Sequence, residues 1–575
     1  MTVTKRWQLA PAAASVLENN RYSLVLRQLL ALRGIDTPAA LEAFLLADLP
    51  RADYLKQFDP FLFSDMEKAV ALIINHIKAG DLITIYGDYD ADGVTSTAAL
   101  WEILTLFKAR VDAYLPDRVS EGYGMNKGAI EKIAANGSRL IITVDNGTRS
   151  YEEVLYAQNL GLDIIITDHH ALPDDEKLIP SCLFINCTDK RQDYPTRNLA
   201  GVGVAFKLVQ ALLAKSKLDE ETKKQLEDKV LDLVAMGTVS DMMPLLGENR
   251  ILVKKGLLEI NKFKRLGVRE LIKVIKSKAE KIDAWGLGFQ IGPRLNAASR
   301  LGNASNALSV LLTKDEAEAS LLAQELNQKN ISRQEITEKI MGEVEAQIDK
   351  ENVPDIIIGV SSIFEEGWNE GVIGLVAGKI CEKYYRPALI ITSTADGFKG
   401  SGRSIEEFNL ISAIEEAKEN LDKYGGHPGA AGFSIYSQEK LDGFTAAMKK
   451  IAAVKLQGLE LSPKLGIDLE LKLSEIDLDL AREVELLSPF GQGNPQPKFV
   501  TYGATINDIV NMGGDNQHIK IRLGSIWAIA FFKSEAYSHL QIGDTVDLVY
   551  YLDINGYNGR SEVQLRIIDL KKTNL

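Results

Sequence analysis

Acidic and imidazole side chains follow several apolar stretches of the 575-residue chain. They are Asp88, Asp90 and Asp92 after LITIY, Asp145 after LIITV, and Asp168, His169 and His170 after DIIIT. In an open parallel sheet, ligands bind beyond the carboxyl ends of the strands, so we expect these groups to converge in space. A further acid, Asp241, ends an apolar stretch that we interpret as a helix. The pattern predicts one polar pocket built from distant segments.

This many carboxylates in one pocket would repel one another and lose hydration unless cations neutralised them. Carboxylate oxygens with one or two imidazoles and no thiolate favour Mn²⁺ or Mg²⁺ over structural zinc. Two such ions ~3.5 to 4 Å apart would activate a water molecule and hold a phosphoryl group for in-line attack. Taken singly, each residue is more often a helix cap, a turn former or an exposed histidine. The metal hypothesis therefore depends on their joint occurrence.

The elements that must position these groups alternate between helices and apolar strands from Asp65 onward. Strands that are apolar throughout predict an α/β fold with a parallel sheet covered on both faces. We expect a helical lead-in over residues 1–58, the site-bearing domain over 59–313, a connecting helix over 314–350, a smaller α/β domain over 351–457 and a small β-barrel over 458–575. Thr313 is the expected N-cap of the connecting helix, which would span ~55 Å at ~1.5 Å per residue.

Composition excludes several classes of protein. The chain is 46% hydrophobic and 25% charged, as in ordinary globular domains, and its length predicts three or four of them. Three cysteines, Cys182, Cys187 and Cys381, cannot form a disulfide framework, and no apolar run is long enough for export or for crossing a membrane. We therefore expect a cytoplasmic protein without a membrane partner. The net charge of −13 argues against nonspecific coating of nucleic acid but permits a local basic groove.

Basic residues gather in two later segments. Arg294, Asn296 and Arg300 in GPRLNAASR could meet phosphates, or could be a solvated surface turn. Between residues 379 and 403, five lysines and arginines face only two acids in the sequence, and GSGRS and GGH offer backbone amides to a phosphate. The expected barrel carries aromatic side chains that could stack on bases or fill its core, namely Trp527, Phe531, Phe532 and Tyr557.

The motifs GDYDADGVTS, VDNG, TDHH and GTVSD, in this order, resemble those of the DHH phosphoesterase superfamily. GPRLNAASRLG, WNEGVIGLVAGKI, GSGRS and GGHPGAAGF resemble the associated DHHA1 module. With RWQLAP, LPDRVSEGYGMN, AGVGVAFKL and SPFGQGNPQPKF, the chain is similar over nearly its whole length to the RecJ family of single-strand-specific exonucleases. The resemblance implies an oligonucleotide-binding (OB) type of barrel at the C-terminus.

The resemblance also implies roles for individual residues. One metal ion would be held by Asp92, Asp145, His169 and Asp241, and the other by Asp90 and Asp145. His170 would contact the phosphate or act as a general acid, Asp88 would support the cluster by hydrogen bonding, and Asp168 would orient a histidine. Many superfamily members have a histidine where this chain has Tyr86, so the Asp90 site is expected to be one ligand short and to bind its metal weakly. The strand would be gripped near its 5′ end by Arg118, Ser401, Arg403 and His427.

The activity that the resemblance implies is metal-dependent degradation of single-stranded DNA from the 5′ end, releasing 5′-mononucleotides in DNA repair and recombination. A groove between lobes would admit one strand but exclude a duplex. A single-strand binding protein and a DNA helicase are the expected protein partners. Two alternatives stay open: a DHH-family oligoribonuclease or cyclic-dinucleotide phosphodiesterase, whose members generally lack the lead-in and the barrel, and a non-catalytic DNA-binding scaffold of the same fold.

Overall fold

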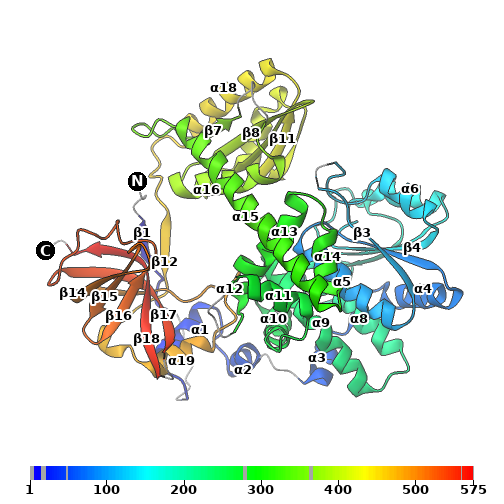
Figure 1. Cartoon of the computed structure of the whole chain (residues 1–575), viewed down its shortest axis with the longest axis horizontal. Coiled ribbons are helices and arrows are strands. Elements are labelled where there is room, and N and C mark those ends of the chain that lie inside the picture. Colours follow the sequence, from blue (N-terminus) through cyan, green and yellow to red (C-terminus); the bar gives the residue numbers. More distant parts are fainter. Residues whose placement is uncertain are drawn as a thin grey trace. The chain divides into compact units, whose positions relative to one another are not determined.

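The computed structural model describes residues 5–13, 21–46, 50–118, 120–275, 281–361, 367–557 and 560–573. The chain divides into two compact units, whose elements Figure 1 labels. Unit 1 contains residues 1–3, 50–243 and 252–462, and unit 2 contains residues 4–49, 244–251 and 463–575. Most of the N-terminal lead-in therefore belongs to the same unit as the C-terminal strands.

Unit 1 contains a five-stranded sheet that is parallel throughout, as the apolar runs predicted. Its strand order is β3-β2-β4-β5-β6. The strands are β2 (Leu82–Tyr86), β3 (Arg110–Tyr114), β4 (Ser138–Val144), β5 (Asp163–Asp168) and β6 (Leu183–Asn186). Helices accompany the strands along the chain: α3 (Arg51–Gln57), α4 (Met66–Ala79), α5 (Ala91–Leu106), α6 (Lys127–Ala135), α7 (Tyr151–Asn159), α8 (Gly201–Lys215) and α9 (Glu220–Ser240).

A helical segment follows this sheet. It consists of α10 (Gly247–Ile260), α11 (Leu266–Ile275), α12 (Ala284–Gly286), the π-helical η3 (Leu287–Ile291), α13 (Gly292–Arg300), α14 (Ser305–Leu312) and α15 (Glu316–Ala346). The predicted connecting helix is α15, but its bounds over 314–350 and its N-cap were wrong. Thr313 is the C-cap of α14, and Asp315 is the N-cap of α15, where its carboxylate accepts a hydrogen bond from the Glu318 amide. The aspartate cap and two glutamates in the first turn favour this later start.

The last part of unit 1 is a smaller α/β domain with a five-stranded sheet. Its order is β10-β11-β9-β8-β7, and only β7 and β8 are parallel. The elements are β7 (Ile357–Val360), α16 (Glu370–Tyr384), β8 (Ala388–Thr394), β9 (Gly397–Arg403), α17 (Leu410–Glu416), β10 (Lys423–His427), β11 (Ala430–Ile435) and α18 (Gln438–Lys455). Its apolar core includes Ile390, Phe408 and Phe444.

Unit 2 is built around a six-stranded sheet of order β13-β14-β15-β16-β18-β17, in which β14 also pairs with β17 and so closes a barrel. The strands are β13 (Leu469–Glu470), β14 (Phe499–Met512), β15 (His518–Leu523), β16 (Ile526–Ala530), β17 (Thr545–Tyr557) and β18 (Arg560–Lys572). Helices α1 (Leu24–Leu32), α2 (Pro38–Leu46) and α19 (Leu478–Glu485) share its apolar core, and β1 (Arg6–Leu9) pairs with β12 (Lys464–Ile467).

The buried Arg250 side chain joins the pieces of unit 2. Its guanidinium donates hydrogen bonds to the backbone carbonyls of Phe44, Leu486, Leu487 and Ser488.

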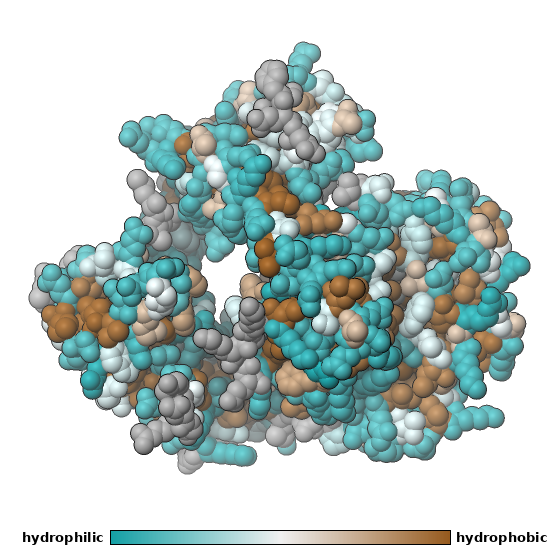
Figure 2. All heavy atoms as spheres, viewed as in Figure 1, coloured by the Kyte–Doolittle hydropathy of each residue, from teal (hydrophilic) through white to brown (hydrophobic). Residues whose placement is uncertain are grey.

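Hydrophilic residues dominate the visible face of the molecule, with apolar residues in separate patches (Figure 2). Among the described helices, none has both the length and the apolar composition needed to cross a membrane.

Candidate metal centre and anion pocket

The carboxyl ends of three neighbouring strands bring the acidic motifs together. Strand β2 pairs with β4, and β4 pairs with β5, all in parallel. Asp88 therefore follows β2, Asp145 follows β4, and His169 follows β5 at one edge of the sheet. The imidazole Nε2 of His169 lies 3.0 Å from an Asp145 oxygen, 3.6 Å from an Asp241 oxygen and 3.9 Å from an Asp92 oxygen. Four segments of the chain thus converge on one histidine.

The ligand atoms of this cluster fit a divalent cation. His169 Nε2, Asp145 Oδ1, Asp241 Oδ2 and Asp88 Oδ1 are buried, and none of them has a hydrogen-bond partner among the described residues. Among the described residues, potential ligand atoms lie within 4.8 Å of one another in three overlapping groups: Asp92, His169 and Asp241; Asp88, Asp90 and Asp145; and Asp145, Asp168, His169 and His170. Unpaired buried polar atoms are rare in folded proteins. Two adjoining cation sites explain why so many occur together here.

The pKa shifts of the clustered carboxyl groups also favour bound cations. Burial and repulsion from Asp90 raise the pKa of Asp88 to about 8. Burial and repulsion from Asp90 also raise the pKa of Asp241 to about 7. Burial raises the pKa of Asp92 and Asp145 well above the ordinary value, and repulsion from neighbouring carboxylates adds to it. Without a cation, the pocket holds protons in place of negative charges, so metal binding must displace protons.

His169 is neutral and presents a lone pair to the cluster. Burial, and then repulsion from His170, lower its pKa to about 4. A hydrogen bond with the Leu199 backbone accounts for Nδ1, because Nε2 has no such partner in the described part of the chain. Nε2 therefore carries the lone pair that a metal ligand requires.

Two helix ends fix the acids of the cluster. Both oxygens of Asp92 accept hydrogen bonds from the first amides of α8, Gly201 at 2.7 Å and Val202 at 2.9 Å. A Cβ at Gly201 would lie 2.5 Å from the Asp145 Cβ, and one at Gly237 would lie 2.7 Å from an Asp92 oxygen. Glycine at both positions lets α8 and α9 approach the carboxylates closely. Asp241 caps the C-terminus of α9, the helical placement that the sequence predicted.

Asp168 does not face the cluster as a free ligand. One oxygen accepts a hydrogen bond from the Thr148 amide, and the other accepts from the amides of His169 and His170 and is 2.8 Å from His170 Nδ1. Burial raises the pKa of Asp168, but hydrogen bonding to His170 and the other donors outweigh it and lower the pKa to about 2. Asp168 is thus an ionised group that orients His170, and it raises the pKa of that imidazole against the effect of burial.

Tyr123 also contacts His170, and sequence reasoning missed it. Its hydroxyl lies 3.0 Å from His170 Nδ1, and the two rings are 5.2 Å apart. The signal available in the sequence was the pair of glycines in EGYGM, since Gly122 and Gly124 both adopt positive φ and hold the tyrosine at a sharp turn.

Asp90 has a weaker set of neighbours. Its Oδ1 caps α5 by accepting from the Asp92 and Gly93 amides. The Tyr86 side chain is buried, and its hydroxyl donates to the Gly124 carbonyl at 3.0 Å. The group around Asp90 contains carboxylates only.

A separate cavity of about 340 Å³ is lined by arginines from both α/β domains of unit 1. Arg118, Arg300 and Arg403 line it together with Ser401, and so do Gly371 and Gly374 from the first turns of α16. None of the three arginines forms an ion pair in the described part of the chain. Arg118 lies over the Tyr89 ring at 4.8 Å. Unpaired guanidinium groups beside a helix N-terminus form an anion site.

Three other residues predicted to bind substrate do not line this cavity. Arg294 donates to the Gln290 carbonyl and to the Asn327 side chain. Asn296 accepts from the Ala91 amide at the start of α5, so it positions the Asp90 loop. His427 is exposed on the edge strand β10. The segment GPRLNAASR is helical (α13), so the surface-turn alternative was wrong.

The basic stretch between residues 379 and 403 is largely neutralised in three dimensions. Lys379 pairs with Glu338, Lys383 with Glu345, and Lys399 with Glu370. Two of these glutamates come from α15, more than thirty positions away in the sequence. Arg403 keeps its charge free for the cavity.

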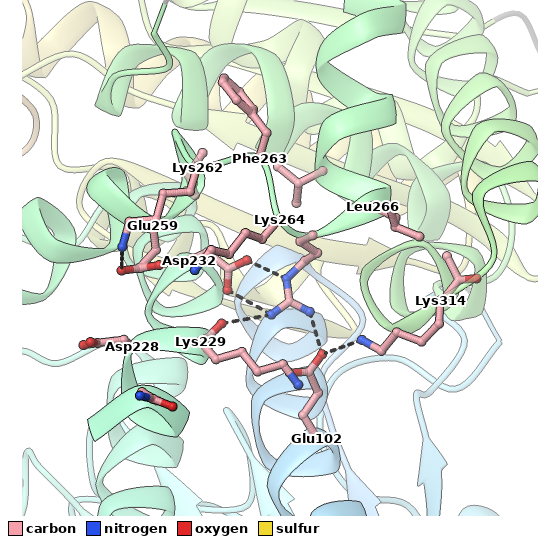
Figure 3. A pocket seen from close by; sticks show the side chains of 15 residues that line it. Glu102, Asp228, Lys229, Asp232, Glu259, Lys262, Phe263, Lys264, Leu266 and Lys314 are labelled. Atoms are coloured by element: carbon pink, nitrogen blue, oxygen red, sulfur yellow. Dashed lines mark hydrogen bonds and ion pairs between the residues drawn. The ribbon is translucent and has the colours of Figure 1, made fainter. Parts of the chain in front are cut away.

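A larger cavity, of about 460 Å³, lies elsewhere in unit 1, and Figure 3 shows its charged lining. Arg265 donates to Asp232 at 2.6 Å and to Glu102 at 2.8 Å, and Lys314 and Lys229 also contact Glu102. Burial raises the pKa of Glu102, but Arg265 and the lysines outweigh it and lower the pKa to about 2. Glu102 and Asp232, the acids of this cavity, are therefore already paired with basic side chains. Because Glu102 belongs to α5 and Asp232 to α9, the ion-pair network joins the helix that carries Asp92 to the helix that Asp241 caps.

Comparison with known proteins matches three domain families along the chain. Residues 82–238 match the DHH family N-terminal domain, residues 355–453 the DHHA1 domain, and residues 467–569 the RecJ OB domain. The single-stranded-DNA-specific exonuclease RecJ of Bacillus subtilis is 35% identical over 98% of this chain and 70% of its own length. The Escherichia coli protein of the same name is 34% identical over 95% of both chains.

The chain belongs to the RecJ family. A crystal structure of RecJ from Thermus thermophilus with Mn²⁺ has a TM-score of 0.79 and 28% identity to it, covering 99% of this chain and 80% of that one. A second structure of that protein contains Mg²⁺ and has a TM-score of 0.72. The expected α/β fold with a DHHA1 domain and an OB barrel is therefore confirmed, and RecJ structures with these two metals agree with the ligand set found here.

Proposed function

We propose that this RecJ-family protein is a Mn²⁺- or Mg²⁺-dependent exonuclease that degrades single-stranded DNA from the 5′ end and releases 5′-mononucleotides. The observation that carries the proposal is the set of buried ligand atoms at Asp145, His169 and Asp241 that have no hydrogen-bond partner in the described ranges. An anion pocket of unpaired arginines in the same unit supports it. An exonuclease that starts at a 5′ end can use both features, the ligand atoms for cleavage and the anion pocket for holding the end of its substrate.

The residues of the acidic cluster would have distinct roles in metal binding and proton transfer. Asp92, Asp145, His169 and Asp241 would hold one cation, and Asp90 with Asp145 would hold a second, more weakly bound one, because Tyr86 is turned to Gly124. Bound divalent cations supply Lewis-acid activation of water and of the phosphodiester. His170, oriented by Asp168, can hold a proton at Nε2 for the leaving oxygen or donate to a phosphate oxygen. Asp88 supports the cluster.

The arginine cavity would bind the 5′ phosphate. Arg118, Arg300 and Arg403 supply charge, Ser401 supplies a hydroxyl, and the first turn of α16 supplies backbone amides. Occupation by the terminal phosphate would fix which phosphodiester reaches the metal centre, and so would give both 5′ polarity and mononucleotide products. Arg294 and the exposed His427 would contact the strand outside this cavity.

The barrel would provide a further contact for DNA. On β15, His518, Lys520 and Arg522 alternate with buried residues and so share the outward face. Lys520 lies over the Trp527 ring at 4.6 Å, and His518 contacts the exposed rings of Phe531 and Phe532. Aromatic rings between unpaired cations are the surface that a single strand binds. The side chain of Tyr557 lies outside the described residues.

The two alternative functions are not favoured. The Bacillus and Escherichia relatives, which match over nearly the whole chain, are named exonucleases specific for single-stranded DNA. A scaffold without activity has no need of unpaired buried ligand atoms. A cytoplasmic location, and a single-strand binding protein and a DNA helicase as partners, are proposed on the family resemblance alone.

The test is degradation of one strand labelled separately at its 5′ and 3′ ends. We expect the 5′ label to appear first as a mononucleotide in Mn²⁺, and no release in chelator or in the Asp145→Asn variant. Asp174→Asn is the matched control, because Asp174 is an exposed aspartate outside the cluster. Early release of the 3′ label, equal activity in chelator, or cleavage of duplex at the same rate would refute the proposal.

A further inference from the structure

Two aromatic side chains stack on the surface of unit 1 just before α13. Trp285 belongs to α12 and Phe289 to the π-helical η3, and their ring centroids are 5.6 Å apart with planes 22° from parallel. Trp285 is 57% exposed and Phe289 is 69% exposed. Single exposed apolar residues are ordinary, but a stacked aromatic pair presents a flat apolar surface to solvent. No part of the RecJ-type site described above uses this pair.

The pair is attached to the metal centre by close packing. A Cβ at Gly288 would lie 3.4 Å from Val239, and one at Gly292 would lie 2.5 Å from the Ser240 hydroxyl. The π-helical turn therefore rests on the last turn of α9, next to Asp241. Single π-helical turns are rare and frequently occur at functional sites. Seven residues after Phe289, or ~10 Å along the helix axis at ~1.5 Å per residue, the Asn296 side chain accepts a hydrogen bond from the Ala91 amide at the start of α5.

Arg294 lies beside the pair and Arg333 lies near Arg294, and neither forms an ion pair with an acid in the described part of the chain. The Arg294 guanidinium donates at 2.7 Å to the carbonyl of Gln290, the residue next to Phe289. Arg333 of α15 donates to Asn330 at 2.9 Å, and its buried Nε has no hydrogen-bond partner among the described residues. Arg333 is close enough to Arg294 and Arg300 for their like charges to repel. The chain has a net charge of −13, and Lys379 and Lys383 pair with glutamates of α15. The cluster of Arg294, Arg300 and Arg333 is therefore an unneutralised positive charge that could bind an anion.

We propose that Trp285 and Phe289 form a base-stacking platform, and Arg333 an adjoining phosphate contact, for the part of a single strand that lies outside the metal centre. The inference rests on the proposed function, which supplies the substrate. Base faces are open for stacking only in a single strand, and every base has such a face, so the platform would bind without sequence preference. Stacked aromatics beside unpaired arginines match the alternating bases and phosphates of that ligand.

The experiment compares four variants of the full-length protein. Trp285→Ala/Phe289→Ala removes the platform, Trp285→Phe keeps two stacked rings, and Arg333→Gln removes one charge. Leu258→Ala is the matched control, because Leu258 is 64% exposed in the same unit. Each variant is measured for binding of oligothymidylate in chelator, and for kcat and KM in Mn²⁺ on a long strand and on the shortest strand that the wild type cleaves.

We expect the double variant to bind the long strand at least tenfold more weakly and to raise its KM by a similar factor, with kcat and short-strand cleavage unchanged. Trp285→Phe and Leu258→Ala should behave as wild type. Arg333→Gln should weaken binding and lower the slope of log affinity against log salt by about 1. Titration of the wild type with oligothymidylate should quench tryptophan emission, and Trp285→Phe should lose part of that quench.

Unchanged long-strand binding in the double variant would overturn the proposal. So would an equal loss on long and short strands, because that result would show damage to the metal centre next to Asp241. Should the double variant not fold, an unaltered quench in Trp285→Phe would overturn it instead. Failure of the proposed function is distinguishable: the wild type would then cleave neither strand in Mn²⁺, while the binding measurements would still report on the platform.

Discussion

Replacing Asp145 by Asn should stabilise the metal-free protein while abolishing its activity. Asp145 is 2% exposed, and one of its oxygens lies within 4.8 Å of ligand atoms of Asp88 and Asp90. Two charges at that separation repel by ~3.5 kcal/mol at an effective dielectric constant of ~20. Asparagine keeps the shape of the side chain, and it tolerates the left-handed backbone at this position, where φ is 63°. Alanine would add backbone strain and confuse the result.

Part of that repulsion is already relieved in the wild type. Burial and the neighbouring carboxylates raise the pKa of Asp145, so a proton neutralises some of the charge. We therefore expect Asp145→Asn to gain ~1 to 3 kcal/mol in chelator, an estimate bounded above by one Coulomb pair. In Mn²⁺ we expect the wild type to be the more stable of the two proteins. A cation at a hundredfold excess over its Kd stabilises the wild type by ~2.7 kcal/mol, whereas the variant has lost a carboxylate that belongs to two of the three groups of potential ligands.

The assay is thermal unfolding in chelator and in Mn²⁺, with exonuclease activity measured on the same samples. The wild-type midpoint should rise by roughly 5 to 10 °C when Mn²⁺ is added, and the midpoint of the variant by much less. Asp174→Asn should follow the wild type throughout. A variant that is less stable than wild type in chelator, or that keeps the full Mn²⁺-induced rise, would refute the account of Asp145 as a repelled carboxylate that bridges two cations.

Four further outcomes are expected. Asp168→Asn should lower kcat roughly 10- to 100-fold but leave Mn²⁺-induced stabilisation intact, because Asp168 orients His170 and its oxygens are used by protein donors; loss of the Mn²⁺ effect would contradict this. Arg403→Gln should raise KM about tenfold for a 5′-phosphorylated strand and less for a 5′-hydroxyl strand, whereas Lys399→Gln, whose cation is already paired with Glu370, should not discriminate between them. Arg265→Met should cost ~3 to 5 kcal/mol in urea unfolding, since it leaves Glu102 and Asp232 buried without their cation, while Lys314→Met, with a 71% exposed side chain, should cost less than ~1 kcal/mol. Glu102 has a folded pKa of about 2 against 4.5, so its contribution of ~3 kcal/mol is present above pH 4.5 and is lost as the pH falls toward 2; wild-type stability should fall more steeply than that of Glu102→Gln across this range.

The sequence predicted the metal cluster because topology alone places its members. Strand-end acids at Asp88, Asp145 and Asp168 must share the carboxyl edge of a parallel sheet, whichever helices cover it. Asp241 was predictable from the end of an apolar helix, although the glycines that let α9 approach Asp92 were not. Local sequence patterns therefore predicted which acids and imidazoles converge, and missed the contacts that position them.

The features that the sequence did not predict depend on contacts between distant segments. Tyr123 reaches His170 from a turn 47 residues earlier, and Glu338 and Glu345 neutralise lysines that looked free in their own segment. Pairing of β1 with β12 and packing of α1 and α2 into the barrel core likewise join segments more than four hundred residues apart. No periodicity within one segment can indicate such partners, because their effect depends on where the backbone folds back.

The ion pairs also explain how an acidic protein can bind a polyanion selectively. Lys379, Lys383 and Lys399 of unit 1 are paired with glutamates, so these three lysines add little to long-range attraction. Within the ranges that the structure describes, Arg118, Arg300, Arg333 and Arg403 form no ion pair; Arg118, Arg300 and Arg403 line the cavity, and Arg333 belongs to α15. A phosphate gains a strong contact only where it reaches these planar donors. Selective binding of a polyanion therefore depends on a few arginines without acidic partners, not on a high density of positive charge.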